Sequence, residues 1–271
     1  MSAQPLPPLT HIPAYLQTIA DYEQQAQKHL TENTWHYLQG GAMDEISVRN
    51  NLDEFKKIQL IPRHLNDFTQ GNTHCEILGQ SFPHPIFLAP IGHQQLFNPE
   101  AETASALAAE VLGSNLVLST FTNTDLRRLK KENPLKWFQL YWQGDRKKSL
   151  ALVQLAEQHH FKALVITIDS PHTGIRDRER RVNFQLPAGM QHPHTPAHIP
   201  LPKISENQHP VFNGLMQIAP QWSDIEFIIA NTNLPVILKG ILHPLDAKKA
   251  LDIGVKGFVI SNHGGRVLDT T

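Results

Sequence analysis

Six short apolar runs recur from residue 85 onward. Most of them are continuously hydrophobic instead of alternating, which is the pattern of strands buried on both faces of a parallel sheet. We therefore predict six such strands. The runs are "PIFLAPIG" (85–92), "NLVLSTFT" (115–122), "KWFQLYWQ" (136–143), "ALVITIDS" (163–170), "PVILKGIL" (235–242) and "GFVISNHG" (257–264).

Helical patterns separate most of these runs. "NPEAETASALAAEVLGS" begins with Asn98 as the expected N-cap, and "SDIE" has capping-box spacing between Ser223 and Glu226. "HPLDAKKALDIG" predicts a helix that starts at Pro244. Residues 14–40 are expected to form one or two helices ahead of the first strand. Strand and helix alternate, so the fold class is α/β, as either a doubly wound sheet or a (β/α)8 barrel.

No strong linker interrupts the chain, which predicts a single domain over residues 1–271. Residues 1–84 form its N-terminal helical segment and residues 85–271 carry the six strands. The stretch "LPAGMQHPHTPAHIPLPKISENQHP" between the fourth and fifth strands is long enough to be a functional lid or a mobile segment. Nearby histidines are expected at the surface, namely His172, His192, His194 and His198.

Polar side chains gather at the C-terminal ends of five runs. They are Ser119, Gln139 with Tyr141, Thr167 with Asp169, Lys239, and Ser261 with His263. Residues two apart on a strand face the same side. In a parallel barrel all the strand tips open onto one face, where active sites are found. A single polar tip is commonly a satisfied structural residue, but five converging tips predict a catalytic mouth.

The chemistry of these tips is that of a proton transfer next to fixed positive charge. Asp169 and His263 suit a carboxylate–imidazole pair, which orients a general base and stabilises its protonated form. Lys239, Arg266 and Arg176 would attract an anionic substrate or charge developing on a cofactor. The histidines do not fall at metal-ligand spacing, so no metal is predicted. Neither GxGxxG after the first strand nor GxxxxGK[ST] occurs, which argues against Rossmann and P-loop chemistry.

The composition limits the classes of binding partner that we expect. Lysine plus arginine (24) nearly cancels aspartate plus glutamate (25), so no overall field favours nucleic acid. The dense cluster "RDRERR" (176–181) is expected to be a mostly solvated turn. A single cysteine, Cys75, excludes an internal disulfide. No apolar run approaches the roughly 20 residues of a membrane span, and the start lacks a signal-peptide pattern. We expect a cytoplasmic protein that has no transmembrane segment and does not bind nucleic acid.

Six motifs in order resemble one known family. They are "YLQGGAMDE", "FLAPIG", "WFQLYWQGDR", "ITIDSPHTGIRDRE", "LPVILKGIL" and "SNHGGRVLD". The sequence is similar to the FMN-dependent 2-hydroxy acid oxidases and dehydrogenases, which include glycolate oxidase, L-lactate oxidase, L-lactate dehydrogenase and mandelate dehydrogenase. The resemblance implies a TIM (β/α)8 barrel with FMN at its C-terminal mouth. It also implies oxidation of a lactate- or glycolate-like L-2-hydroxy acid to the 2-oxo acid, and a homotetramer.

The resemblance also implies a role for each site residue. His263 would be the base that acts on the hydroxy acid, Asp169 would stabilise its imidazolium, and Tyr141 would hydrogen-bond near the substrate hydroxyl. Lys239 would lie at the flavin N1/C2 carbonyl and stabilise the reduced anion. The substrate carboxylate would bind Arg176, Arg266 and Tyr37. The other cofactor contacts would be Ser119, Gln139, Thr167 and the backbone of Ala89, Pro90, Ile91 and Gly92.

The family's barrel has eight strands, whereas this chain shows six. In the family the last two strands carry "DGGxRRGxD" and "GRP" motifs, and the loops after strands seven and eight hold the phosphate. We therefore expect that the native protein is longer, that a partner completes the barrel, or that the chain is a remnant. The alternative function is a catalytically inactive remnant or interaction subunit that does not hold FMN tightly. A weaker reading is an unrelated barrel enzyme that acts on a phosphorylated substrate. The particular hydroxy acid and the electron acceptor stay open.

Overall fold

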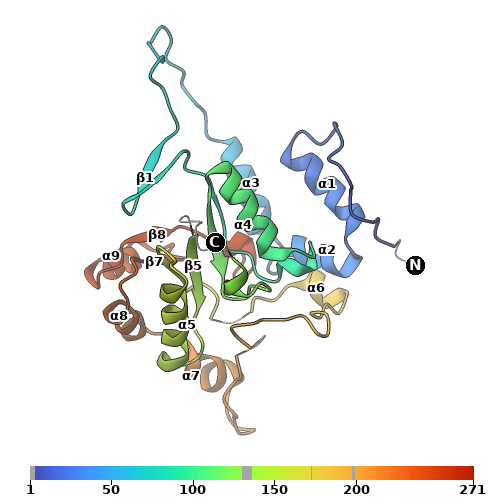
Figure 1. Cartoon of the computed structure of the whole chain (residues 1–271). Helices are drawn as coiled ribbons and strands as arrows, with labels where there is room; N and C mark the ends of the chain where they lie inside the picture. Colours follow the sequence, from blue (N-terminus) through green and yellow to red (C-terminus); the bar gives the residue numbers. More distant parts are fainter. Residues whose placement is uncertain (1–3, 130–135, 172, 197–198) are drawn as a thin grey trace.

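A six-stranded parallel sheet forms the core of the protein. The computed structural model describes residues 4–129, 136–171, 173–196 and 199–271 (Figure 1). All six predicted strands are confirmed, and each is shorter than its apolar run. Asp169, Ser261 and His263 lie just beyond the strands, whereas the other polar tips lie within them. The strands are β3 (Phe87–Leu88), β4 (Asn115–Ser119), β5 (Lys136–Tyr141), β6 (Leu164–Thr167), β7 (Val236–Lys239) and β8 (Gly257–Val259).

The strand order decides between the two α/β architectures. Neighbours in the sheet follow the sequence without reversal, β3-β4-β5-β6-β7-β8, and every pair is parallel. A doubly wound sheet would reverse its order at a switch point. The sheet is therefore a six-stranded half-barrel, as the barrel prediction requires.

Helices cover one face of this sheet. They are α4 (Ala101–Leu112), α5 (Arg146–Gln158), α8 (Trp222–Ala230) and α9 (Pro244–Asp252). Figure 1 shows α5, α8 and α9 lined up along the outer side of the strands. Val153 of α5, Ile228 of α8 and Ala250 of α9 are fully buried there, in one core with the strand residues Leu140 and Leu238. This outer layer is the larger of the two hydrophobic clusters.

The opposite face of the sheet points into the half-barrel. Val117, Trp137, Val165 and Ile237 form a second buried cluster there, one residue from each of four neighbouring strands. Phe82 packs against the same cluster with no exposed surface. Because side chains alternate along a strand, the residues two positions further on also point inward. The predicted polar tips therefore stand directly above an apolar layer.

Phe82 belongs to an element that the sequence analysis missed. β1 (Cys75–Ile77) and β2 (Gln80–Phe82) form a short antiparallel hairpin. Its two-residue turn has positive φ at Leu78 (52°) and Gly79 (70°), the combination of a type I′ turn. The indole of Trp137 donates to Gln80 Oε1 at 3.2 Å and fixes the hairpin under the sheet. Gly79, between the apolar pair Ile77-Leu78 and Phe82, was the available signal.

Three helices precede the hairpin. The prediction of one or two helices within residues 14–40 is confirmed by α1 (Ile19–His29) and α2 (Glu32–Gln39), and α3 (Ile46–Lys56) was not predicted. The segment between α3 and β1 extends away from the sheet (Figure 1). Among the described helices, none is long and apolar enough to cross a membrane.

Two predicted helix starts are wrong. α4 begins at Ala101, and the side chain of Asn98 accepts from the backbone N–H of Glu100 at 2.8 Å outside the helix. At α8 the reciprocal contact is made by Asp224, whose carboxylate accepts from the N–H of Gln221 at 2.8 Å. Ser223 instead accepts from Arg146 Nη2 at 3.2 Å. A carboxylate is favoured at a helix N-terminus because it complements the helix dipole.

The N-terminus of α3 is capped by a residue far away along the chain. Glu45 precedes the helix with φ of 59° and makes no side-chain cap. The carboxylate of Asp269 accepts from the backbone N–H of Ser47 at 2.7 Å and of Ile46 at 3.2 Å. Asn51 of α3 and Asn262 also exchange side-chain hydrogen bonds at 3.1 and 2.9 Å. The segment after β8 is thus tied to the N-terminal helices.

This cap predicts a pH-dependent contribution to stability. The N–H groups of Ser47 and Ile46 hold the pKa of Asp269 below its ordinary value. A folded-state pKa below the unfolded one stabilises the fold above the ordinary carboxyl range, and this contribution is lost as pH falls through the folded pKa. Asp269→Asn is therefore expected to lower the thermal midpoint by roughly 3 °C at neutral pH, and by less as pH approaches 3. Circular dichroism melts at several pH values measure it.

Asp44→Asn is the matched control, since Asp44 is an exposed carboxylate on the turn before α3. Its melting curves are expected to follow the parent at every pH. Equal midpoints for Asp269→Asn and the parent at neutral pH would show that the long-range cap contributes nothing.

Candidate active site

The inward-facing tips of three neighbouring strands form a floor of hydrogen-bonding groups. Ser119 ends β4, Thr167 ends β6, and Gln139 lies two residues before the end of β5; each of the three is buried. Gln139 Nε2 donates to Thr167 Oγ1 at 2.9 Å, and Ser119 Oγ accepts from the backbone N–H of Phe121 at 3.2 Å. Both hydroxyls accept a bond from the protein and keep their own O–H to donate. The floor can therefore donate to the ring carbonyl or nitrogen of a planar ligand.

His263 and Asp169 meet above this floor. His263 Nδ1 lies 2.8 Å from Asp169 Oδ1, while Lys239 Nζ lies 3.6 Å from Asp169 Oδ2 and 3.5 Å from His263 Nδ1. The short contact to a carboxylate assigns the Nδ1 proton to the bond with Asp169. Nε2 then carries the free lone pair of the imidazole, and the hydroxyl of Tyr141 lies 3.3 Å from it. This is the arrangement of a general base with an orienting carboxylate.

Burial shifts the pKa values of two neighbours of this pair. It lowers the pKa of Lys239, although Asp169 offsets part of that shift. It also raises the pKa of Tyr141, and the charge of Asp169 adds to the increase. Tyr141 is therefore a protonated phenol that can donate to an oxygen at the mouth. Several neighbouring groups with shifted pKa values are typical of functional sites.

Two unusual backbone conformations hold the pair together. His263 has φ of 60°, and its N–H donates to Ser261 Oγ at 3.0 Å. Gly240, directly after β7, has φ of 105°, and a Cβ there would lie 2.4 Å from Cβ of Asp169. Backbone in these regions is disfavoured for residues with a side chain. Only glycine lets the chain after β7 pass this close to Asp169.

A second cluster holds two guanidiniums beside an aromatic ring. Arg266 Nη1 donates to the carbonyls of Gly40 and Leu38, and its guanidinium carbon lies 5.2 Å from the ring centre of Tyr37. Arg176 Nε is buried and has no hydrogen-bond partner among the residues that the structure describes. Burial raises the pKa of Tyr141, and the charge of Arg176 offsets a small part of this increase. An orphaned buried N–H next to fixed positive charge is suited to a carboxylate.

The segment after β3 borders the floor. A Cβ at Gly92 would lie 3.0 Å from Cβ of Phe121 and 3.5 Å from Oγ of Ser119, which places the Gly92 backbone beside the floor. Pro90 and Gly92 are half-buried, whereas Ala89 and Ile91 are exposed. The structure thus brings the predicted segment to the edge of the mouth.

The sequence analysis missed a pair of histidines at this mouth. His93 Nδ1 and His192 Nε2 are 2.8 Å apart, and the His93 ring stacks on Phe121 at 5.5 Å. His194 accepts from the backbone N–H of Leu126 at 3.0 Å. The surface prediction is therefore wrong for His192 and His194, which are half-buried. His172 and His198 lie outside the described residues. No local pattern could reveal a contact between residues 99 positions apart.

The cluster "RDRERR" is also more ordered than predicted. It contains the short helix α6 (Asp177–Arg181), in which Arg180 and Arg181 are exposed. Arg178 instead pairs with Glu45 at 2.6 Å, and Glu179 contacts Arg176 at 2.7 Å. A carboxylate three positions after an arginine on a helix was the signal for the second contact.

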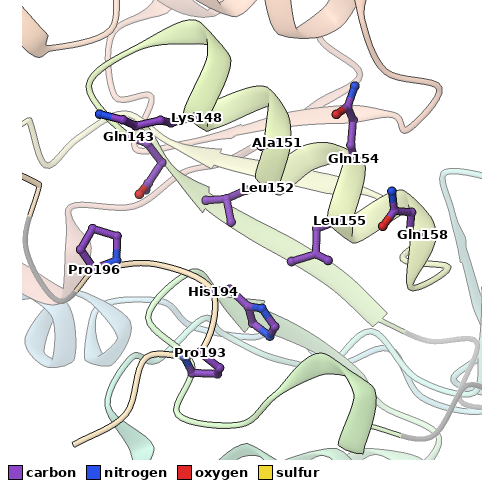
Figure 2. Close-up of a pocket in the computed structure, with 10 residues that line it drawn as sticks. All are labelled: Gln143, Lys148, Ala151, Leu152, Gln154, Leu155, Gln158, Pro193, His194 and Pro196. Atoms are coloured by element: carbon purple, nitrogen blue, oxygen red, sulfur yellow. The ribbon is translucent and has the colours of Figure 1, made fainter.

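A hollow of about 480 Å³ lies outside this site. Figure 2 shows it between α5 and the segment 193–196, with Gln143 and His194 on its walls. None of the strand-tip residues described above lines it.

Known proteins are similar to this chain in sequence and in fold. Residues 26–271 match the family described as FMN-dependent dehydrogenase. The chain belongs to this family. It is 40% identical over 259 residues to an L-lactate oxidase of Roseobacter sp. (strain GAI101), covering 93% of this chain and 69% of that protein. It is 37% identical over 254 residues to a 4-hydroxymandelate oxidase of Amycolatopsis orientalis, covering 93% and 71%.

A solved structure of a family member agrees with the half-barrel. A mandelate oxidase with benzoyl-formic acid superposes with a TM-score of 0.82 at 35% identity, covering 93% of this chain and 70% of that one. The predicted family is therefore confirmed, and the α/β half-barrel corresponds to about 70% of a complete family member. FMN is the cofactor of the family by its description.

Proposed function

We propose that this chain carries the site for FMN-dependent oxidation of an L-2-hydroxy acid to the 2-oxo acid. The observation that supports it most is the His263–Asp169 contact of 2.8 Å at the strand tips. A base on one side and two guanidiniums on the other match the hydroxyl and the carboxylate of one small substrate. Lactate-like acids are the proposed substrate class, because one relative is named L-lactate oxidase.

Each site residue has its own role in the proposed reaction. Arg176 and Arg266 bind the substrate carboxylate, with Tyr37 completing this end of the site. His263 Nε2 takes the hydroxyl proton, and Asp169 stabilises the imidazolium that forms. Tyr141 donates a hydrogen bond to the substrate oxygen. Loss of the hydroxyl proton and of the C2 hydrogen with its two electrons converts the alcohol carbon to a carbonyl.

The residues at the tips suit FMN as the acceptor of those electrons. Ser119, Gln139 and Thr167 offer donors on the floor, the backbone of residues 89–92 borders it, and Lys239 supplies a buried positive charge. When bound, FMN supplies a two-electron acceptor for the C2 hydrogen. A cation next to such an acceptor favours the negative charge that develops during reduction.

A visible spectrum of the purified chain tests this proposal. FMN is added in excess, unbound FMN is removed by gel filtration, and L-lactate is then added without oxygen. We expect a retained flavin band that bleaches with L-lactate and does not bleach with D-lactate. Loss of all FMN on the column would contradict the proposal and favour the inactive remnant. Retained flavin that resists a panel of L-2-hydroxy acids would contradict the proposed reaction.

A further inference from the structure

Glu179 lies between the two arginines of the proposed carboxylate site. Its Oε1 accepts from Arg176 Nη1 at 2.7 Å and from Arg266 Nη2 at 3.3 Å. The three side chains are largely buried, with exposed fractions of 15% for Glu179, 17% for Arg176 and 22% for Arg266. One carboxylate oxygen therefore joins a guanidinium next to α6 to a guanidinium from the segment after β8.

The charges of this cluster are partly compensated. Burial lowers the pKa of Arg266, and the repulsion from Arg176 lowers it further. Burial raises the pKa of Glu179, whereas both arginines lower it. Two guanidiniums and one carboxylate leave a net charge of +1, because Glu179 cancels one of the two positive charges. Without it, two like charges would be buried side by side.

Glu179 does not use the donors that a substrate needs. It contacts one terminal nitrogen of each guanidinium, and main-chain carbonyls accept hydrogen bonds from Arg266 Nη1. Arg176 Nε is buried and has no hydrogen-bond partner within the described part of the chain. The edge of a guanidinium that includes Nε can bind a carboxylate with two parallel hydrogen bonds. Glu179 thus fixes both groups while this edge of Arg176 stays available.

We propose that Glu179 is a positioning residue that sets the affinity and charge preference of the carboxylate site. It holds the two guanidiniums at a fixed separation, and it limits their combined charge to +1, which suits a monocarboxylate. The inference rests on the proposed function of the arginine pair. It adds that the site prefers monocarboxylic over dicarboxylic acids and that the preference resides in Glu179.

Two substitutions separate position from charge. Glu179→Gln keeps an oxygen that can bridge the arginines but removes the negative charge. Glu179→Asp keeps the charge but is one methylene shorter, so it cannot reach both guanidiniums. Asp177→Asn is the matched control. It removes a carboxylate of the same helix whose ion pair, among the residues that the structure describes, is with Arg180 at 3.3 Å. Circular dichroism establishes that all variants are folded.

Calorimetric titration with pyruvate and oxalate, with and without added FMN, tests the inference. We expect Glu179→Gln to bind pyruvate about tenfold more tightly and to gain more for the dianion oxalate. Glu179→Asp is expected to bind pyruvate about tenfold more weakly. In flavin-reduction assays it should raise the KM for L-lactate while the rate at saturation stays within about twofold. Asp177→Asn should match the parent in both titrations.

The outcomes distinguish this inference from the proposed function. One outcome would overturn the role of Glu179 alone. In it the parent chain binds pyruvate and reduces FMN, and Glu179→Gln keeps the parent's preference for pyruvate over oxalate. A parent chain that binds neither anion would overturn both, because the arginine pair would then hold no carboxylate. If only Glu179→Gln bound oxalate more tightly than the parent, the result would support both the proposed function and the role of Glu179.

Discussion

His263→Gln is expected to slow the reduction of bound FMN by L-lactate about a thousandfold or more. Glutamine has a similar reach, but its amide cannot take a proton from the substrate hydroxyl at neutral pH. General-base catalysis by a positioned histidine contributes about 10²–10⁴ in rate. The large value is expected here because Asp169 holds Nδ1 at 2.8 Å and directs the lone pair of Nε2 into the mouth. Stopped-flow bleaching of the flavin without oxygen measures the rate.

The exposed His64 provides the matched control. His64→Gln should reduce FMN at the parental rate, and both variants should retain FMN on gel filtration. Asp169→Asn should lose a large part of the same rate, and the double variant should lose little beyond His263→Gln, since groups that act as one unit are not additive. Reduction by His263→Gln at the parental rate would remove His263 from the role of base.

Gly240→Ala is expected to destabilise the fold by about 3 kcal/mol or more and to disable the site. Two effects add. Alanine is disfavoured at φ of 105°, and its Cβ would lie 2.4 Å from Cβ of Asp169. The backbone must shift or Asp169 must leave His263, so flavin reduction should slow even in folded molecules. Urea denaturation followed by circular dichroism gives the free energy of unfolding.

Gly254→Ala separates the two effects. Gly254 has φ of 99°, but its nearest neighbour would be Ile229 Cγ2 at 3.9 Å, an ordinary contact. This variant carries the conformational cost of about 1–2 kcal/mol without the overlap, and it should reduce FMN normally. If Gly240→Ala lost no more stability than Gly254→Ala, the close approach to Asp169 would not be the reason for the glycine.

Much of the site could be predicted because it follows from the strands. A continuous apolar run indicates a buried strand, and alternation then fixes which residues face inward. Val117 and Ser119, or Val165, Thr167 and Asp169, share one face for this reason. The helix caps were predicted less well. Asn98 and Ser223 are good capping residues in isolation. Asn98 instead accepts from the N–H of Glu100 outside α4, and at α8 Asp224 makes the cap contact while Ser223 accepts from Arg146.

The residues that sequence reasoning missed have partners far away along the chain. Asp269 caps α3 across 222 residues, and His93 meets His192 across 99. Glu179 was assigned to a solvated turn because charges of alternating sign surround it in "RDRERR". Its contact with Arg266 depends on how the segment after β8 returns to α6. Such contacts leave no periodic signal, since neither partner repeats at a helical or strand spacing.

The sequence by itself determined the strands, their inward faces and the polar residues at their tips. It did so because burial of apolar side chains imposes a period that is visible along the chain. Only the tertiary structure decided the single-direction strand order, the distance of 2.8 Å between the predicted partners His263 and Asp169, and the position of Glu179 between two arginines. Electrostatic and hydrogen-bond energies depend on distance through space, and the folded backbone sets that distance.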